Sequence, residues 1–227
     1  MKRLAIATCL LASAAAANAL IVLRPQATLE PLAGETKVEL GGHRLLVPRA
    51  LIRDHAQMQG GRLDRLDLVM LAEGLAPLPP VDAKRPEAAP PERVALVLTP
   101  SDDRLSSIDM FGKVYARFLS GETMPTPSGL MLRRFREKTP YEDRELYLGV
   151  GTGRTFVALC PLPEAQAKEP CTTTFRLAGL DMELRFSAAR LPQWRRMTEH
   201  AFSLMEEMTR EQVEANRIPL PPENPGG

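Results

Sequence analysis

An apolar leader at the N-terminus constrains the chain more than any other sequence feature. Lys2 and Arg3 form a short basic start, and residues 4–23 are an uncharged, largely apolar stretch that ends at Arg24. About 20 such residues are enough to cross a bilayer as a helix. Basic residues in front of an apolar segment stay in the cytoplasm, so the rest of the chain is expected on the other side of the membrane.

Two fates of the leader, residues 1–23, stay open. Residues 17–19 match the A-x-A pattern of a signal-peptidase site, so cleavage after Ala19 would release a soluble periplasmic protein. However, residues 20–23 are apolar where a mature N-terminus usually becomes polar. Retention of residues 4–23 would instead give a single-pass protein of the bacterial inner membrane with its domain in the periplasm. Either fate predicts a location in the bacterial envelope.

The cysteines agree with export. Outside the leader the chain has Cys160 and Cys171, each at the end of a strand-like run, and the segment between them is proline-rich and polar. This pattern predicts two antiparallel strands joined by a long loop. If the two cysteines face each other, the period of two places Ala158 opposite Thr173. In an oxidising compartment the pair is expected to form a disulfide, whereas in the cytosol both thiols would stay free.

Hydrophobic patterning predicts an α+β domain over 24–215, in which an antiparallel sheet packs against amphipathic helices. Strands are expected at 37–40, 44–47, 66–71, 93–99, 130–135, 146–150, 155–160, 171–177 and 181–186. Helices are expected at 50–59, at 102–119 with Ser101 as N-cap, and from Pro192 onward. A Pro-rich stretch at 76–92 could divide the domain, and 216–227 is expected to be a disordered tail.

The glycine-rich segment 149–153 invites comparison with phosphate-binding loops. Such a loop must lead from a strand into a helix, whereas 155–160 has the pattern of another strand, so we interpret the segment as a hairpin turn. The histidines and serines also lack the spacings of metal sites and nucleophile elbows. The sequence therefore identifies no catalytic residue, no cofactor-binding residue and no metal site.

The charge balance bears on the partner. With 29 basic and 28 acidic residues, the chain gives no reason to expect nucleic acid, because phosphate binding needs a basic surface. A local cluster of Arg133, Arg134 and Arg136 could still contact lipid headgroups or an acidic partner. The alternative is that these arginines belong to a solvated strand face. We keep them as a candidate interaction patch.

Three segments together carry a resemblance to known proteins. They are V-P-R-A-L-I-R…G-G-R-L-D-R-L-D-L (47–68), G-L-M-L-R-R-F (129–135) and F-V-A-L-C…C-T-T-T-F…L-R-F…L-P-Q-W (156–194). In these segments the chain resembles a group of proteobacterial membrane-anchored or periplasmic proteins without assigned function. The resemblance implies a location in the envelope and assigns no residue a catalytic role.

Two functions remain. The leader and the lack of catalytic motifs favour a non-enzymatic, envelope-facing interaction or accessory protein that binds a protein or an envelope component. The alternative is a small periplasmic hydrolase with scattered catalytic residues. An exposed apolar or charged patch would support the first function, and a pocket with a His–Ser or His–carboxylate cluster would support the second.

Overall fold

The structure, a computed structural model, describes residues 34–78, 92–151 and 153–215. The predicted leader, most of the Pro-rich stretch and the predicted tail lie outside these residues, and their interpretations stay predictions. None of the described helices has the length and apolar character of a membrane span.

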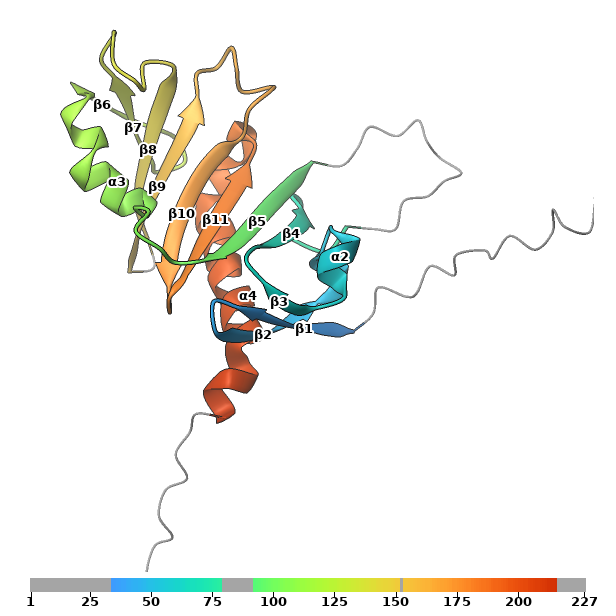
Figure 1. The fold of residues 1–227 in the computed structure, drawn as a ribbon. Helices are drawn as coiled ribbons and strands as arrows, with labels where there is room; N and C mark the ends of the chain where they lie inside the picture. Colours follow the sequence, from blue (N-terminus) through green and yellow to red (C-terminus); the bar gives the residue numbers. More distant parts are fainter. Residues whose placement is uncertain (1–33, 79–91, 152, 216–227) are drawn as a thin grey trace, which may run out of the picture. The chain divides into compact units, whose positions relative to one another are not determined.

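The described strands form two sheets. The small sheet consists of β1 (Glu35–Leu40), β2 (His43–Pro48) and β3 (Gly61–Leu63), with β1 in the centre. The strands of the large sheet are β4 (Leu66–Leu71), β5 (Arg93–Pro100), β6 (Leu119–Pro125), β7 (Met131–Phe135), β8 (Arg144–Gly151), β9 (Arg154–Pro161), β10 (Cys171–Leu177) and β11 (Leu180–Phe186). Their order is β4-β5-β11-β10-β9-β8-β7-β6, and every neighbouring pair is antiparallel (Figure 1).

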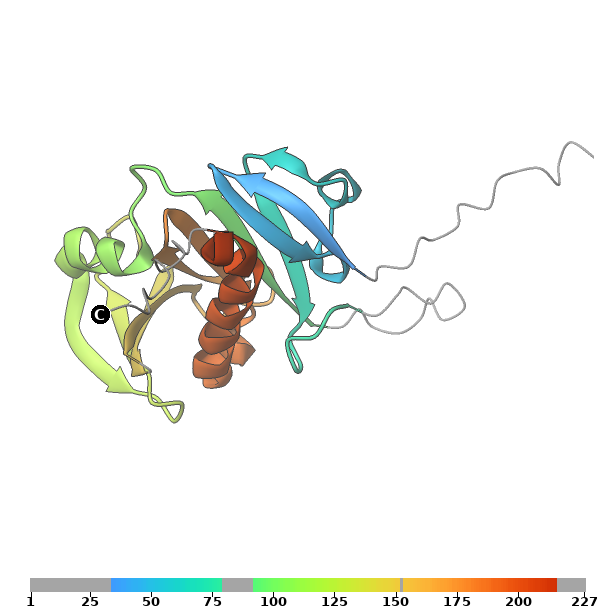
Figure 2. The same ribbon diagram turned by 90° about the horizontal axis from the view of Figure 1, so that it is seen from below.

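The longer helices lie on opposite faces of the large sheet. One face is covered by α3 (Ser107–Lys113) and the 3-10 turn η2 (Tyr115–Arg117), and the other by α4 (Trp194–Ala215) (Figures 1 and 2). The remaining helical segments are short: η1 (Arg49–Leu51), α2 (His55–Met58) and η3 (Ala188–Gln193). The described chain is therefore an α+β domain with an antiparallel sheet and few helices, which confirms this part of the predicted fold class.

Alternating side chains give the sheet two apolar cores. The main core lies on the face that α4 covers, which we call the inner face, where Met182 and Phe186 of β11 pack with Trp194 and Met205 of α4 and with the β1–β2 hairpin. A smaller core lies on the opposite, outer face, beneath α3 and η2. Its buried members are Tyr115, Leu119, Phe135, Leu146 and Val157. The strands β8 and β9 therefore have covered residues on both faces of the sheet.

β8 and β9 form the predicted hairpin, but Gly149 and Gly151 belong to β8 and pair with β9, so the turn is shorter than the predicted 149–153. Gly153 has φ of +73°, a backbone conformation that favours glycine at the turn. Gly149 has a packing role, because a Cβ there would lie 2.6 Å from Leu130 Cδ2 and 2.9 Å from Trp194 Cζ2. The absent side chain lets the Trp194 ring rest directly on β8.

The observed helices are shorter than the predicted ones. Instead of a helix over 50–59, the chain forms η1 and α2 as separate short turns. The helix expected at 102–119 begins only after Ser106, whose Oγ accepts a hydrogen bond from the Asp109 amide, so Ser101 is not its N-cap. It ends at Lys113 and is followed by η2, and Leu119 then pairs with Phe135 and starts β6, a strand that the sequence did not predict. Similarly, Pro192 lies in η3, and α4 begins at Trp194.

Candidate binding site between strands β9 and β10

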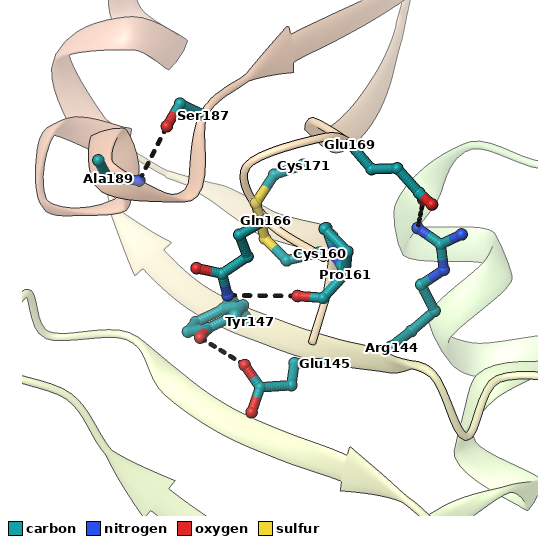
Figure 3. Close-up of a disulfide and its surroundings, with 10 residues drawn as sticks. All are labelled: Arg144, Glu145, Tyr147, Cys160, Pro161, Gln166, Glu169, Cys171, Ser187 and Ala189. Carbon is teal, nitrogen blue, oxygen red and sulfur yellow. Dashed lines mark hydrogen bonds and ion pairs between the residues drawn. A yellow bond between two sulfur atoms is a disulfide. The ribbon is translucent and has the colours of Figure 1, made fainter. Parts of the chain in front are cut away.

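A disulfide marks one end of the site. Cys160 and Cys171 are fully buried, face each other across β9 and β10 with their Cα atoms 4.1 Å apart, and form a disulfide (Figure 3). The register pairs Leu159 with Thr172, which places Ala158 opposite Thr173, as the sequence predicted. The loop between the cysteines is held to β8 by an ion pair of 2.8 Å between Arg144 and Glu169, and the Gln166 side chain donates a hydrogen bond of 3.2 Å to the carbonyl of Pro161 in β9 (Figure 3).

Beyond the disulfide the two strands diverge. Leu159 and Thr172 are the one residue pair in register between β9 and β10 within the part of the chain that the structure describes. Continuing this register would pair Thr174 with Val157, but that pair does not form. We call the opening between 154–157 of β9 and 173–177 of β10 the fork. Each strand of the fork keeps its ladder on the far side, β9 with β8 and β10 with β11.

A serine from α3 binds the β10 side of the fork. Ser107 inserts its side chain between the strands, and its Oγ accepts a hydrogen bond of 2.7 Å from the backbone amide of Thr174. Because this amide points away from β11, it is one that an adjacent strand would bind in an unbroken sheet. The hydroxyl therefore replaces a strand partner on the β10 side of the fork. The Ser107 hydroxyl does not replace a strand partner for the backbone groups of β9 that face the fork.

The fork contains a cavity of about 280 Å³. Its lining comes from α3, from both fork strands and from α4. Thr173 belongs to this lining, is completely buried, and its Oγ1 has no hydrogen-bond partner among the described residues. A buried hydroxyl without a partner costs free energy, so it marks a place where a ligand group or water can add a hydrogen bond.

Two arginines give the cavity its charge. The Arg176 guanidinium binds Asp181, with a shortest distance of 2.7 Å, and this hydrogen bond raises the pKa of the arginine. Arg154, by contrast, has no carboxylate partner among the described residues, and its guanidinium lies 3.8 Å above the ring centroid of Phe202. The cation–π contact fixes the guanidinium at the wide end of the fork. The lining therefore has one positive charge that is not neutralised by a carboxylate.

Exposed apolar side chains gather beside the fork. Among the described residues, the large hydrophobic side chains that are most exposed are Val150 at 78%, Ile108 at 46% and Met131 at 41%. Ile108 lines the cavity, and Val150 is the cross-strand partner of Thr155, another lining residue. Exposed apolar side chains around a polar centre are typical of surfaces that bind another protein.

The predicted arginine patch is divided between the two faces of β7. Arg133 donates a hydrogen bond of 2.8 Å to the Ser120 carbonyl, while Arg134 points the other way and forms an ion pair of 3.3 Å with Glu145. Arg136 follows the strand and donates to a backbone carbonyl. Strand alternation therefore separates Arg133 from Arg134, and the patch stays a prediction.

Glu145 belongs to a polar group near the disulfide. It is 2% exposed and accepts a hydrogen bond of 2.9 Å from the Tyr147 hydroxyl (Figure 3). Burial and this hydrogen bond raise the pKa of Tyr147 far above its ordinary value. The ion pair with Arg134 joins the carboxylate to β7, while its hydrogen bond with Tyr147 lies within β8.

A second cavity, of about 360 Å³, lies on the outer face of β4, β5 and β11. Two of its arginines are paired, since Arg65 binds Asp67 at 2.7 Å and Arg185 binds Glu183, while Arg53 and Asp54 also line it. Asp67 has a lowered pKa, chiefly because of the hydrogen bond from Arg65. The described residues contain no group of three or more His, Cys, Asp or Glu side chains that could hold a metal ion. The fork is the better candidate for binding a partner, because it has a buried hydroxyl without a hydrogen-bond partner and exposed apolar side chains beside it.

The fold is similar to that of a solved protein described as Smlt3025, an immunity protein of the Stenotrophomonas maltophilia type IV secretion system. The TM-score is 0.57 with 15% sequence identity, over 77% of this chain and 93% of that chain. At this identity the likeness concerns the fold. No protein-family model matches the sequence, and no curated protein sequence matches it.

Sequence reasoning found the disulfide but missed the fork. Ser107, Arg154 and Phe202 come from three separate elements, and nothing in their local sequence indicates that they meet. One signal was available at Thr173. The period of two that buries Cys171 and Phe175 also buries this threonine, and a polar residue at such a position needs a partner.

Proposed function

We propose that the chain is a non-enzymatic, envelope-facing binding protein that acts in the manner of an immunity protein, by binding a toxic partner protein. The observation that carries this proposal is the fork, an open pair of strand edges with an uncompensated arginine and a rim of exposed apolar side chains. The similarity to an immunity protein supports the proposal at the level of the fold.

The proposal places the domain, residues 24–215, in the periplasm. Support comes from the predicted leader and from the buried disulfide, which persists in an oxidising compartment. Residues 4–23 would either anchor the domain to the inner membrane or be removed after Ala19. Alkaline phosphatase fused after Gly227 should be active in either case, and its retention in washed membranes would distinguish an anchor from a cleaved signal.

The immunity role is tested by competition between bacteria. A strain that lacks this gene should be killed when it grows in contact with its own secreting parent. The full-length chain should restore survival, whereas a version without residues 2–23, confined to the cytoplasm, should not. A parent whose secretion apparatus is inactivated provides the control, because it should leave the deletion strain unharmed. Equal survival of deletion and parent strains under active secretion would refute the immunity role.

A further inference from the structure

The two edges of the fork differ in what they can still bind. On β10, Ser107 already accepts the hydrogen bond of the Thr174 amide. On β9, continuation of the register identifies Thr155 and Val157 as the residues whose backbone groups point into the fork. Neither has a backbone partner across the fork among the described residues. An incoming strand would therefore pair with the edge of β9.

The charge of the residues that line the fork indicates which charge the incoming strand should have. Arg176 is neutralised by Asp181, so the remaining charge is that of Arg154, which Phe202 holds at the wide end of the fork. A carboxylate next to Arg154 would complete an ion pair with a guanidinium that is already fixed in place. The Thr173 hydroxyl, buried and without a partner, offers a further hydrogen bond to the same guest.

The size of the cavity argues for a peptide. Its volume of about 280 Å³ is at the lower end of the range of about 300–1,000 Å³ that is usual for small-molecule sites. A space of this size suits one or two side chains of an extended segment whose remaining residues lie outside the cavity. Val150 and Ile108, exposed on the rim, can then pack against the neighbouring side chains of that segment.

We propose that the fork receives an extended, acidic segment of the partner protein, which adds a strand to the free edge of β9 and places a carboxylate against Arg154. The proposal rests on the proposed function and specifies the chemistry of the partner. Main-chain hydrogen bonds to β9 would provide affinity, while Arg154 and the rim would select the sequence.

The probe is a library of random 12-residue peptides displayed on phage and selected on the full-length chain, purified in detergent with its disulfide intact. The selected peptides should be enriched in Asp or Glu within alternating β-branched residues. Their affinity should fall at least tenfold with Arg154→Glu and stay unchanged with Arg93→Glu. Arg93 is a matched control because it is also the exposed first residue of a strand, and it lies outside the fork lining. Failure to enrich acidic peptides, or equal affinities for both variants, would overturn the proposal.

Hydrogen exchange tests strand pairing directly, because an electrostatic contact with Arg154 alone would not protect the backbone amides of β9. Binding of the selected peptide should slow exchange at the amides of Thr155 and Val157, because strand addition places hydrogen bonds there. Protection confined to other parts of the sheet would show that the peptide does not pair with β9, even if Arg154 contributes to affinity.

The competition assay separates this proposal from the function on which it rests. A deletion strain that Arg93→Glu protects and Arg154→Glu does not would support both. Full protection by Arg154→Glu would overturn the fork proposal while the immunity role stands. A deletion strain without any defect would count against the immunity role, and the peptide selection would then decide the fork proposal by itself.

Discussion

Loss of the disulfide between Cys160 and Cys171 should destabilise the domain by an amount that the loop length sets. The bond closes a loop with a sequence separation of 11, for which the chain-entropy relation gives about 3 kcal/mol at 25 °C. Both cysteines are fully buried, so a serine at either position would also bury a hydroxyl group. The double variant C160A/C171A avoids that complication and adds about 1 kcal/mol for the lost packing of the sulfur atoms.

The free energy of unfolding of C160A/C171A should therefore be lower by about 3–4 kcal/mol, as measured by urea unfolding followed by circular dichroism. For a domain of 150–250 residues this corresponds to a fall in Tm of roughly 6–16 °C, at about 2–4 °C per kcal/mol. The fold itself should survive, because the main core does not depend on the two sulfur atoms alone.

Reductant provides the matched control. It should lower the Tm of the wild-type protein toward that of C160A/C171A and leave the double variant unchanged. In addition, both cysteines of the denatured wild-type protein should resist alkylation until reductant is added. A loss of less than about 1 kcal/mol, or free alkylation of Cys160 and Cys171 in the exported protein, would refute the argument from loop closure.

Three further predictions concern single side chains. Gly149→Ala should cost about 1–3 kcal/mol, because the added Cβ overpacks the contact with α4, whereas Gly121→Ala, with nothing within 4 Å, should be tolerated; thermal melts compare the two. Ser107→Ala should cost about 1 kcal/mol of unfolding free energy in urea and speed exchange of the amide that its hydroxyl binds. Because the hydrogen bond from Arg65 lowers the pKa of Asp67, their pair stabilises the fold above about pH 4 and loses this effect as the pH falls through the lowered pKa. Asp67→Asn should therefore lower the free energy of unfolding in urea by up to about 1 kcal/mol near pH 7, a difference that shrinks as the pH falls through the lowered pKa of Asp67.

The structure also shows which local signals are reliable in this chain. The hairpin of β1 and β2 and the register of the cysteines followed from sequence, because short loops and the period of two restrict strand pairing to few arrangements. The helix expected at 102–119 was wrong in extent. Its apolar spacing continues to Phe118, but strand pairing of Leu119 with Phe135 on the sheet overrides the local helical pattern.

The edge strand β6 illustrates the opposite case. Its residues, L-S-G-E-T-M-P, are mostly polar and only Leu119 is buried, so no alternation marks it as a strand. Its conformation is set by pairing with β7, with an irregularity between Leu119 and Thr123. A strand that is defined by hydrogen bonds to its neighbour and that buries few side chains shows no hydrophobic alternation in its sequence.

The sequence by itself determined the α+β class and the strand pairing around the cysteines, and it predicted an export signal that lies outside the described residues. Only the tertiary structure decided where a partner could bind. In the fork, Ser107, 67 positions before Thr174, accepts the hydrogen bond of a strand amide. Arg154 and Phe202 meet there from a strand and a distant helix. Periodicity records what each segment buries, but it carries no information about which distant side chain enters a gap between strands, since that depends on how separate elements pack.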